Sequence, residues 1–314
     1  MRPRFQWNLG RRSLALGERT LVMGVLNVTP DSFSDGGRYL DPNAAIAHGL
    51  RLLDEGADIL DIGGESTRPG TPIDSSAAGS QPGAVSAQQE LDRVLPVLEA
   101  IRRERPSAVL SIDTYKSMAA RAALDAGAEI VNDVSGLTWD AKMASTVAAH
   151  PCGVVLMHTR GVPAEWAALP ALPDPVPLVM AELRTRAEDA IKAGIARSSI
   201  VLDLGFGFGK RGEENYPLLA RLAEFEALGF PLLAALSRKS FLARTRDART
   251  AELVASAASA ATSNREASDR ENLTLAATVA AALAGAHIVR VHAVAPAMEA
   301  LAIADAILNA RGSS

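Results

Sequence analysis

Several features that mark particular protein classes are scarce or absent in this 314-residue sequence. Cys152 is the only cysteine, so no internal disulfide bond can form, which suits a reducing compartment. No apolar run approaches the ~20 residues that span a bilayer, and the N-terminal residues lack the apolar stretch of a secretory signal. We therefore expect a soluble, cytoplasmic protein that does not contact a membrane.

Basic residues are not in excess. Lys and Arg number 32 against 36 Asp and Glu, which gives a formal net charge of −4. This balance argues against nucleic acid as a partner, so any anionic ligand must be bound by a few placed cations. No H-x-x-x-H pair or cysteine cluster is present, and we therefore expect no structural zinc site.

Short apolar, β-rich runs recur along the chain, and the segments between them, such as residues 44–57, have apolar residues at i, i+3, i+4 spacing. Runs that are apolar throughout are typical of a parallel sheet covered on both faces. The predicted strands are Leu21–Val28, Ala57–Ile62, Ala108–Ile112, Glu129–Val134, Gly153–Met157, Ser199–Leu204, Pro231–Leu236 and His287–Val291.

Eight such strand–helix units predict a (β/α)8 barrel of the TIM type, with a doubly wound open sheet as the alternative. The length suits one domain over residues 1–314. Alternation in residues 5–17 predicts a short N-terminal β-hairpin that closes the barrel floor. The alternation of strands and helices is interrupted in residues 71–86 and 244–272. We therefore expect mobile loops at about 28–38, 66–88 and 244–270. The last of these should include an extra helical turn or a disordered piece.

Polar residues follow the expected carboxyl ends of all eight strands, where the active site of a barrel lies. Asp113, Asn132 and Asp203 fall on one arc, and an amino-pyrimidine edge would supply the N–H donors that they need. A second arc is cationic and suits phosphate oxygens. Its residues are Arg68, Arg290 and His292, and Lys239 could serve either arc.

Two further features concern ligands. Asn27 and Asp31 offer oxygen donors of the kind that Mg²⁺ accepts while it retains most of its waters. The segment GFGFGK, residues 205–210, is neither a P-loop nor the dinucleotide fingerprint. Its glycines would let the backbone approach a flat ligand, with Phe206 or Phe208 as a ring face.

These residues together resemble dihydropteroate synthase, the folate-pathway enzyme family that sulfonamides inhibit. The motifs occur in the family's order and span nearly the whole chain. They are NVTPDSFSDGG (27–37), DIGGESTRPG (61–70), SIDT (111–114), NDVSG (132–136), MH-x-RG (157–161), LD-x-GFGFGK (202–210), SRKS (237–240) and RVH (290–292).

The resemblance implies a homodimeric (β/α)8 barrel that condenses (7,8-dihydropterin-6-yl)methyl diphosphate with 4-aminobenzoate to 7,8-dihydropteroate and pyrophosphate, with Mg²⁺ as cofactor. Judged by the motifs, Asn27 resembles the family's Mg²⁺ ligand. Lys239, Arg68 and Asp203 resemble its catalytic residues. The residues that resemble the family's pterin-binding set are Asp113, Asn132, Asp203 and Lys239. Those that resemble its diphosphate and loop contacts are Thr67, Arg68, Arg290 and His292. Those that resemble its aminobenzoate site are Phe208, Pro69 and Ser240.

The chain departs from the family at three positions. Ala293 stands where Asp is usual, Leu204 where Pro is common, and Ala235 where Gly often occurs. Each change affects local packing more than the charge at the expected centre. Two other functions are compatible with a pterin-binding barrel: a corrinoid-linked methyltransferase, which needs no diphosphate site, and a non-catalytic pterin-binding barrel, in which the cationic arc would be eroded.

Overall fold

The computed structural model describes residues 2–29, 41–75, 79–245 and 263–311. Eight parallel strands form a closed barrel in the order β10-β11-β12-β3-β4-β7-β8-β9, which confirms the predicted (β/α)8 architecture and excludes the open sheet. The strands are β3 (Leu21–Asn27), β4 (Ile59–Gly63), β7 (Val109–Asp113), β8 (Ile130–Asp133), β9 (Gly153–Met157), β10 (Ile200–Asp203), β11 (Leu232–Ala234) and β12 (Ile288–Val291).

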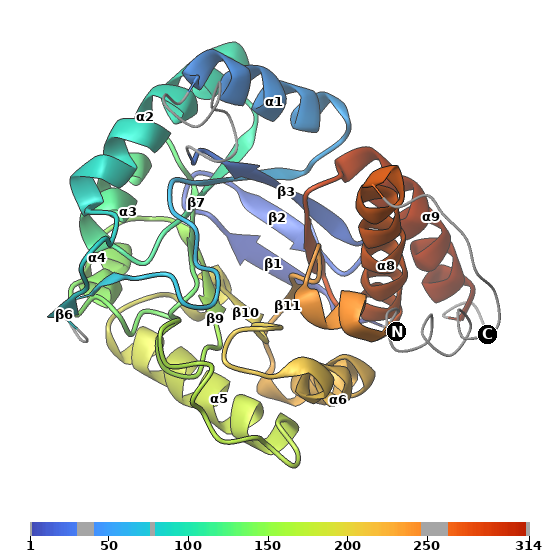
Figure 1. The fold of residues 1–314 in the computed structure, drawn as a ribbon. Helices are drawn as coiled ribbons and strands as arrows, with labels where there is room; N and C mark the ends of the chain where they lie inside the picture. The colour runs from blue at the N-terminus through green and yellow to red at the C-terminus, as the bar shows by residue number, and fades with distance from the viewer. Residues whose placement is uncertain (1, 30–40, 76–78, 246–262, 312–314) are drawn as a thin grey trace.

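Helices surround the barrel as an outer ring (Figure 1). Local signals set their ends: Ser86 and Gln89 form a capping box at the start of α2, and Pro42 occupies the first turn of α1, behind the Asp41 cap. The helices with both ends described are α1 (Pro42–Asp54), α2 (Ala87–Glu104), α3 (Ser117–Asp125), α4 (Met143–Ala148), α5 (Val176–Lys192), α6 (Asn215–Ala220), α8 (Ser263–Leu283) and α9 (Val294–Arg311), with the 3-10 turns Arg197–Ser199, Gly212–Glu214 and Leu222–Leu228. A further helix begins at Ser240.

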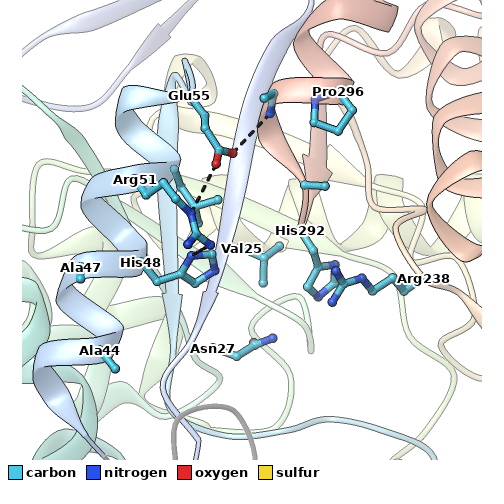
Figure 2. Close-up of a pocket in the computed structure, with 13 residues that line it drawn as sticks. Val25, Asn27, Ala44, Ala47, His48, Arg51, Glu55, Arg238, His292 and Pro296 are labelled. Atoms are coloured by element: carbon cyan, nitrogen blue, oxygen red, sulfur yellow. Dashed lines mark hydrogen bonds and ion pairs between the residues drawn. The ribbon is translucent and has the colours of Figure 1, made fainter. Parts of the chain in front are cut away.

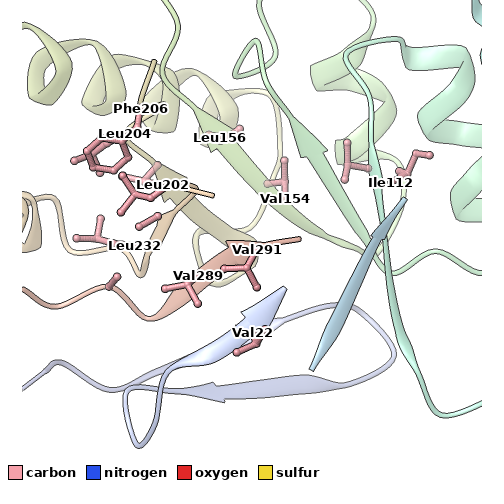
Figure 3. Close-up of a cluster of buried hydrophobic side chains, with 14 of the residues drawn as sticks. Val22, Ile112, Val154, Leu156, Leu202, Leu204, Phe206, Leu232, Val289 and Val291 are labelled. Atoms are coloured by element: carbon pink, nitrogen blue, oxygen red, sulfur yellow. The ribbon is translucent and has the colours of Figure 1, made fainter. Parts of the chain in front are cut away.

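The barrel strands are buried on both faces, as their continuous apolar runs predict. On β3, Val22 and Leu26 belong to the core between strands and helices, whereas Met23 belongs to the core inside the barrel. Figure 3 shows part of the outer core, which includes Val154 and Leu202. Most polar groups of these strands therefore lie toward their carboxyl ends, with the buried Asp61 and Ser111, at the centres of β4 and β7, as exceptions.

The predicted N-terminal hairpin is confirmed as β1 (Phe5–Asn8) and β2 (Ser13–Leu16). Its Trp7, Leu9 and Leu16 pack against inward-facing residues near the amino ends of the strands, so the hairpin closes the barrel floor. The indole N–H of Trp7 donates to the carbonyl of Ser199 at 2.8 Å. The open end of the barrel is therefore the carboxyl end of its strands.

The structure describes only parts of the two segments, 71–86 and 244–272, that interrupt the strand–helix alternation. Residues 71–86 contain a two-residue hairpin, β5 (Asp74–Ser75) with β6 (Gly79–Ser80), and a buried Ile73, while residues 76–78 lie outside the described part. Residues 30–40 and 246–262 also lie outside it, and α8 begins at Ser263. The expected mobility of these loops stays a prediction. Among the described helices, none has both the length and the apolar character needed to cross a membrane.

Candidate active site

Strand register brings polar residues to one level at the open end. Asn27 pairs in register with Gly63, Gly63 with Asp113, and Asp113 with Asn132, across β3, β4, β7 and β8. On the opposite side of the barrel, Asp203 ends β10. Parallel pairing thus gathers at one rim residues that lie far apart in the chain.

A cavity of about 610 Å³ opens at this rim, which is a volume typical of small-molecule sites. It joins Asp113 to Arg290 and Asn27, so one member of the arc formed by Asp113, Asn132 and Asp203 shares a pocket with the cationic arc. Asn132 and Asp203 do not line the cavity and lie at the neighbouring strand ends. The predicted residues that line it are Asn27, Thr67, Arg68, Pro69, Asp113, Phe208, Lys239, Ser240, Arg290 and His292.

Arg290 connects the carboxylates of the rim. Its Nε lies 2.6 Å from Asp61 Oδ2 and its Nη2 lies 2.5 Å from Asp113 Oδ2. The amide of Asn132 donates to the same oxygen of Asp61 at 2.9 Å. Arg290 therefore spans the two arcs, whereas the sequence assigned it to the cationic arc alone.

Burial changes the charge states of these groups. Desolvation raises the pKa of Asp113 to about 7, although Arg290 opposes that rise. Burial also acts to lower the pKa of Arg290, but the nearby Asp61 and Asp113 carboxylates outweigh it and the pKa is raised. Near neutral pH, Arg290 therefore carries a full positive charge, whereas Asp113 lies close to its pKa.

Asp203 and Lys239 form the second charged pair. Burial raises the pKa of Asp203, against opposing effects of the Gly205 amide and Lys239. Burial lowers the pKa of Lys239 to about 8, and Asp203 opposes that shift. Lys239 Nζ lies 4.1 Å from the centroid of the Phe208 ring, a cation–π arrangement. Lys239 thus connects the Asp203 side of the site to the aromatic wall.

The GFGFGK segment packs against the chain's own backbone. Gly205 has φ +66°, and a Cβ there would lie 1.9 Å from the carbonyl oxygen of His158. The buried Lys210 ammonium donates to the carbonyls of Gly205, Phe208 and His158 at 2.7–3.3 Å. At Gly205 the missing side chain therefore makes room for the backbone of another loop, whereas Gly207, with φ +81°, lines the cavity. That the glycines of this segment let the backbone approach a flat ligand stays a prediction. Of the two candidate rings, Phe208 lines the cavity and Phe206 is fully buried in the core.

The cationic arc contains Arg68 and a neutral His292. Burial, followed in effect by the Arg238 guanidinium, lowers the pKa of His292 to about 3. The Ser237 hydroxyl lies 2.9 Å from His292 Nδ1. His292 therefore offers a polar contact to an anion without a full positive charge near neutral pH.

A second cavity, of about 720 Å³, adjoins the first, and Asn27, Arg238 and His292 line both. Figure 2 shows Asn27 between the α1 side chains His48 and Arg51 on one side and His292 and Arg238 on the other. Asn27 thus lines both cavities, at the place where they meet.

Some residues of the site were missed, among them Asp61, which lies at the rim but does not line the main cavity. Asp61 could have been found, since it is a charged residue inside an otherwise apolar strand, and it accepts from Arg290 and Asn132. No sequence pattern marks Trp166 as a site residue, since it is expected only to be an aromatic residue packed in a loop. In the structure its ring stands edge-on to Phe208 with ring centroids 5.2 Å apart. His158, a strand-end candidate, is fully buried at 3.1 Å from Glu182 and does not line the main cavity.

The chain is similar over most of its length to known proteins. Residues 23–292 match the family described as pterin binding enzyme. The dihydropteroate synthase of Mycobacterium leprae is 44% identical over 290 residues, 92% of this chain and 94% of that protein.

Two solved structures of Xanthomonas albilineans dihydropteroate synthase are also similar. One holds 4-aminobenzoic acid, is 40% identical, covers 98% of this chain and 99% of its own, and has a TM-score of 0.78. The other holds 7,8-dihydropteroate, is 38% identical, covers 94% and 96%, and has a TM-score of 0.74. With matches of this extent, the chain belongs to the dihydropteroate synthases, within the family of pterin binding enzymes.

Proposed function

We propose that this chain is a Mg²⁺-assisted dihydropteroate synthase whose single rim cavity binds the pterin diphosphate and 4-aminobenzoate together. The main support for this proposal is that Asp113, Arg68 and His292 line one cavity of about 610 Å³. A carboxylate and a cationic group in the same pocket match the two ends of a pterin diphosphate, one an array of N–H donors and the other an anion.

On the pterin side, the residues leave acceptors for a donor-rich ring. Arg290 and Asn132 both donate to Asp61 Oδ2, and Asp61 Oδ1 is buried with no hydrogen-bond partner among the described residues. Arg290 contacts one oxygen of Asp113. We propose that three groups accept hydrogen bonds from the pterin: the second carboxylate oxygen of Asp113, the side-chain amide oxygen of Asn132 and the carboxylate of Asp203. We also propose that Lys239 contacts the same ring.

On the diphosphate side, negative charge grows on the departing oxygen as the C–O bond to the methylene carbon breaks. Arg68, Arg290 and the neutral His292 line the cavity where that charge would be stabilised. The arylamine nitrogen of 4-aminobenzoate then forms the C–N bond, pyrophosphate leaves, and one of the two amine protons passes to the released pyrophosphate or to water. Because the neutral amine attacks, no strong general base is required.

The position of Asn27 is compatible with its serving as one ligand of a magnesium ion that is bound mainly by the substrate. It places one neutral oxygen donor at the junction of the two cavities, and the described residues contain no group of three or more His, Cys, Asp or Glu that could hold a metal alone. Mg²⁺ commonly takes one or two protein oxygens plus phosphates and water. When bound, it would neutralise diphosphate charge.

For 4-aminobenzoate, we propose the wall formed by Phe208, Pro69 and Ser240. Phe208 is held between Trp166 and Lys239, and Ser240 begins a helix, whose N-terminus favours a carboxylate. Thr67 lines the cavity beside Pro69.

The decisive experiment incubates the purified chain with both substrates and Mg²⁺. We expect pyrophosphate release that depends on 4-aminobenzoate, its loss with EDTA, and a higher Mg²⁺ requirement in Asn27→Ala. Pyrophosphate release without 4-aminobenzoate, or none at all, would contradict the proposal. Transfer of a methyl group from methyltetrahydrofolate to a corrinoid would favour the methyltransferase, and pterin binding without turnover would favour the non-catalytic barrel.

We also propose a homodimer located in the cytoplasm. The family resemblance supports the dimer, and on α9 the exposed Ile303 and Ile307, one turn apart, offer an apolar face. Light scattering after size exclusion should give twice the chain mass, and Ile303→Arg should reduce it; a monomeric wild type would contradict the dimer. Fractionation should place the chain with cytoplasmic markers.

A further inference from the structure

A buried ionic cluster lies at the start of the segment that carries Thr67, Arg68 and Pro69. Lys116 Nζ contacts a carboxylate oxygen of Glu65 and lies 2.7 Å from Glu90 Oε2. The three side chains are only 1–5% exposed. None of the steps above uses them. Burying charges in this way gains little stability over apolar side chains of the same volume, so the cluster suggests a role in fixing geometry.

The Tyr115 hydroxyl joins both ends of the same segment. It donates to Glu65 Oε1 at 3.1 Å and accepts from the backbone N–H of Asp74 at 3.1 Å. Its ring is 1% exposed and stands edge-on to Trp139, with centroids 5.1 Å apart. One hydroxyl therefore closes residues 65–74 into a loop whose ends cannot move independently.

Helix α2 fixes the entry to this loop. Arg93 donates to the carbonyl of Gly64 at 2.7 Å, and Glu90 from the same helix contacts Lys116. A Cβ on Gly64 would lie 2.8 Å from Val94 and 3.0 Å from Glu90, so glycine allows the close approach. The loop is thus connected to both α2 and the end of β7.

Within the loop, hydrogen bonds hold the turn that faces the cavity. The N–H of Thr71 donates to the carbonyl of Arg68 at 3.0 Å, and the N–H of Gly70 donates to the carbonyl of Pro163 at 3.1 Å. Arg68 and Pro69 line the main cavity at this turn. Their placement therefore depends on where the loop ends are held.

We propose that Tyr115, together with Lys116, Glu65 and Glu90, positions the loop 65–74 so that Thr67, Arg68 and Pro69 face the diphosphate and 4-aminobenzoate. Tyr115 is a positioning residue, because its hydroxyl contacts Glu65 and Asp74 at the two ends of the loop while its own side chain does not line the cavity. The inference rests on the proposed function for its kinetic consequence. The clamp itself is testable without turnover.

The test compares Tyr115→Phe with the matched control Tyr216→Phe. Tyr216 also hydrogen-bonds through its hydroxyl, to Thr245, and stands edge-on to Phe241 at 5.3 Å, but it lies on α6 outside the loop. For Tyr115→Phe we expect faster amide hydrogen exchange over residues 66–74, a KM for 4-aminobenzoate at least fivefold higher, and a change in kcat and in pterin diphosphate affinity of less than twofold. The control should match the wild type.

A second variant removes the ionic cluster while keeping its volume: Lys116→Met with Glu65→Gln and Glu90→Gln. It should reproduce the faster exchange over residues 66–74. Because Glu65 lines the cavity, the effect on KM is taken from Tyr115→Phe alone. Unchanged exchange over residues 66–74 in Tyr115→Phe would overturn the clamp even if the wild type proved inactive. Faster exchange with an unchanged KM in an active enzyme would overturn the positioning role. An inactive wild type with a loosened loop in Tyr115→Phe would instead contradict the proposed function.

Discussion

Lys239 shows, at the scale of a single residue, how burial and a partner charge oppose each other. Burial lowers the pKa of its ammonium to about 8, while Asp203 acts in the other direction. At pH 7 the side chain is mostly protonated and lies over the Phe208 ring. A cation in this place can contact the pterin and compensate the charge of Asp203.

Lys239→Ala should therefore reduce kcat by about 10²-fold or more, the usual effect of removing a preorganised charged donor from a site. The control is Lys192→Ala, which removes an exposed lysine of α5 that pairs with Asp189. Steady-state kinetics of pyrophosphate release measure both variants. Near-wild-type turnover in Lys239→Ala would remove this lysine from the mechanism.

Asp203→Asn tests the pterin side. The substitution keeps an acceptor oxygen for the Gly205 amide, 2.8 Å away, but removes the negative charge. Pterin diphosphate affinity should fall by about 1.5–3 kcal/mol, roughly 10–100-fold, as for one charged hydrogen bond. Calorimetric titration gives the affinity, with the exposed Asp189→Asn as control. Equal affinity in the wild type and Asp203→Asn would place this carboxylate outside the pterin pocket.

At the scale of elements, apolar runs predicted every barrel strand, because parallel strands covered on both faces leave a strong signal. β11 is shorter than its run, Leu232–Ala234 against the predicted Pro231–Leu236. The site was predictable where a polar residue follows a strand, as with Asp113. Arg290 was not fully predictable, because no local pattern shows that its guanidinium turns to Asp61 and Asp113 across the barrel.

The N-terminal hairpin should contribute to stability without contributing to catalysis. Trp7 is fully buried at the floor, at the opposite end from the rim cavity. Trp7→Ala should lower the free energy of unfolding by about 3–5 kcal/mol, measured by urea denaturation. At a temperature where the variant is folded, kcat/KM should stay within twofold of the wild type. A large loss of kcat/KM in folded protein would show that the floor affects the rim.

At the scale of the whole molecule, the site should be visible in the pH dependence of stability. Burial raises the pKa of Asp113 to about 7, whereas an unfolded aspartate titrates near 4. Between these values the folded chain retains a proton that the unfolded chain has released. This group therefore lowers the stability of the fold as the pH rises from about 4 to 7.

Asp113→Asn removes that contribution, so between pH 4 and 7 the stability of the variant should rise with pH relative to the wild type. Asp133, whose pKa burial raises to about 6, acts in the same direction in both chains. Urea unfolding at several pH values measures the two curves, and the exposed Asp189→Asn should run parallel to the wild type. Parallel curves for Asp113→Asn would mean that this carboxyl titrates near its ordinary pKa in the folded chain, and the Arg290–Asp113 pair would then be a lasting ion pair that a pterin must displace.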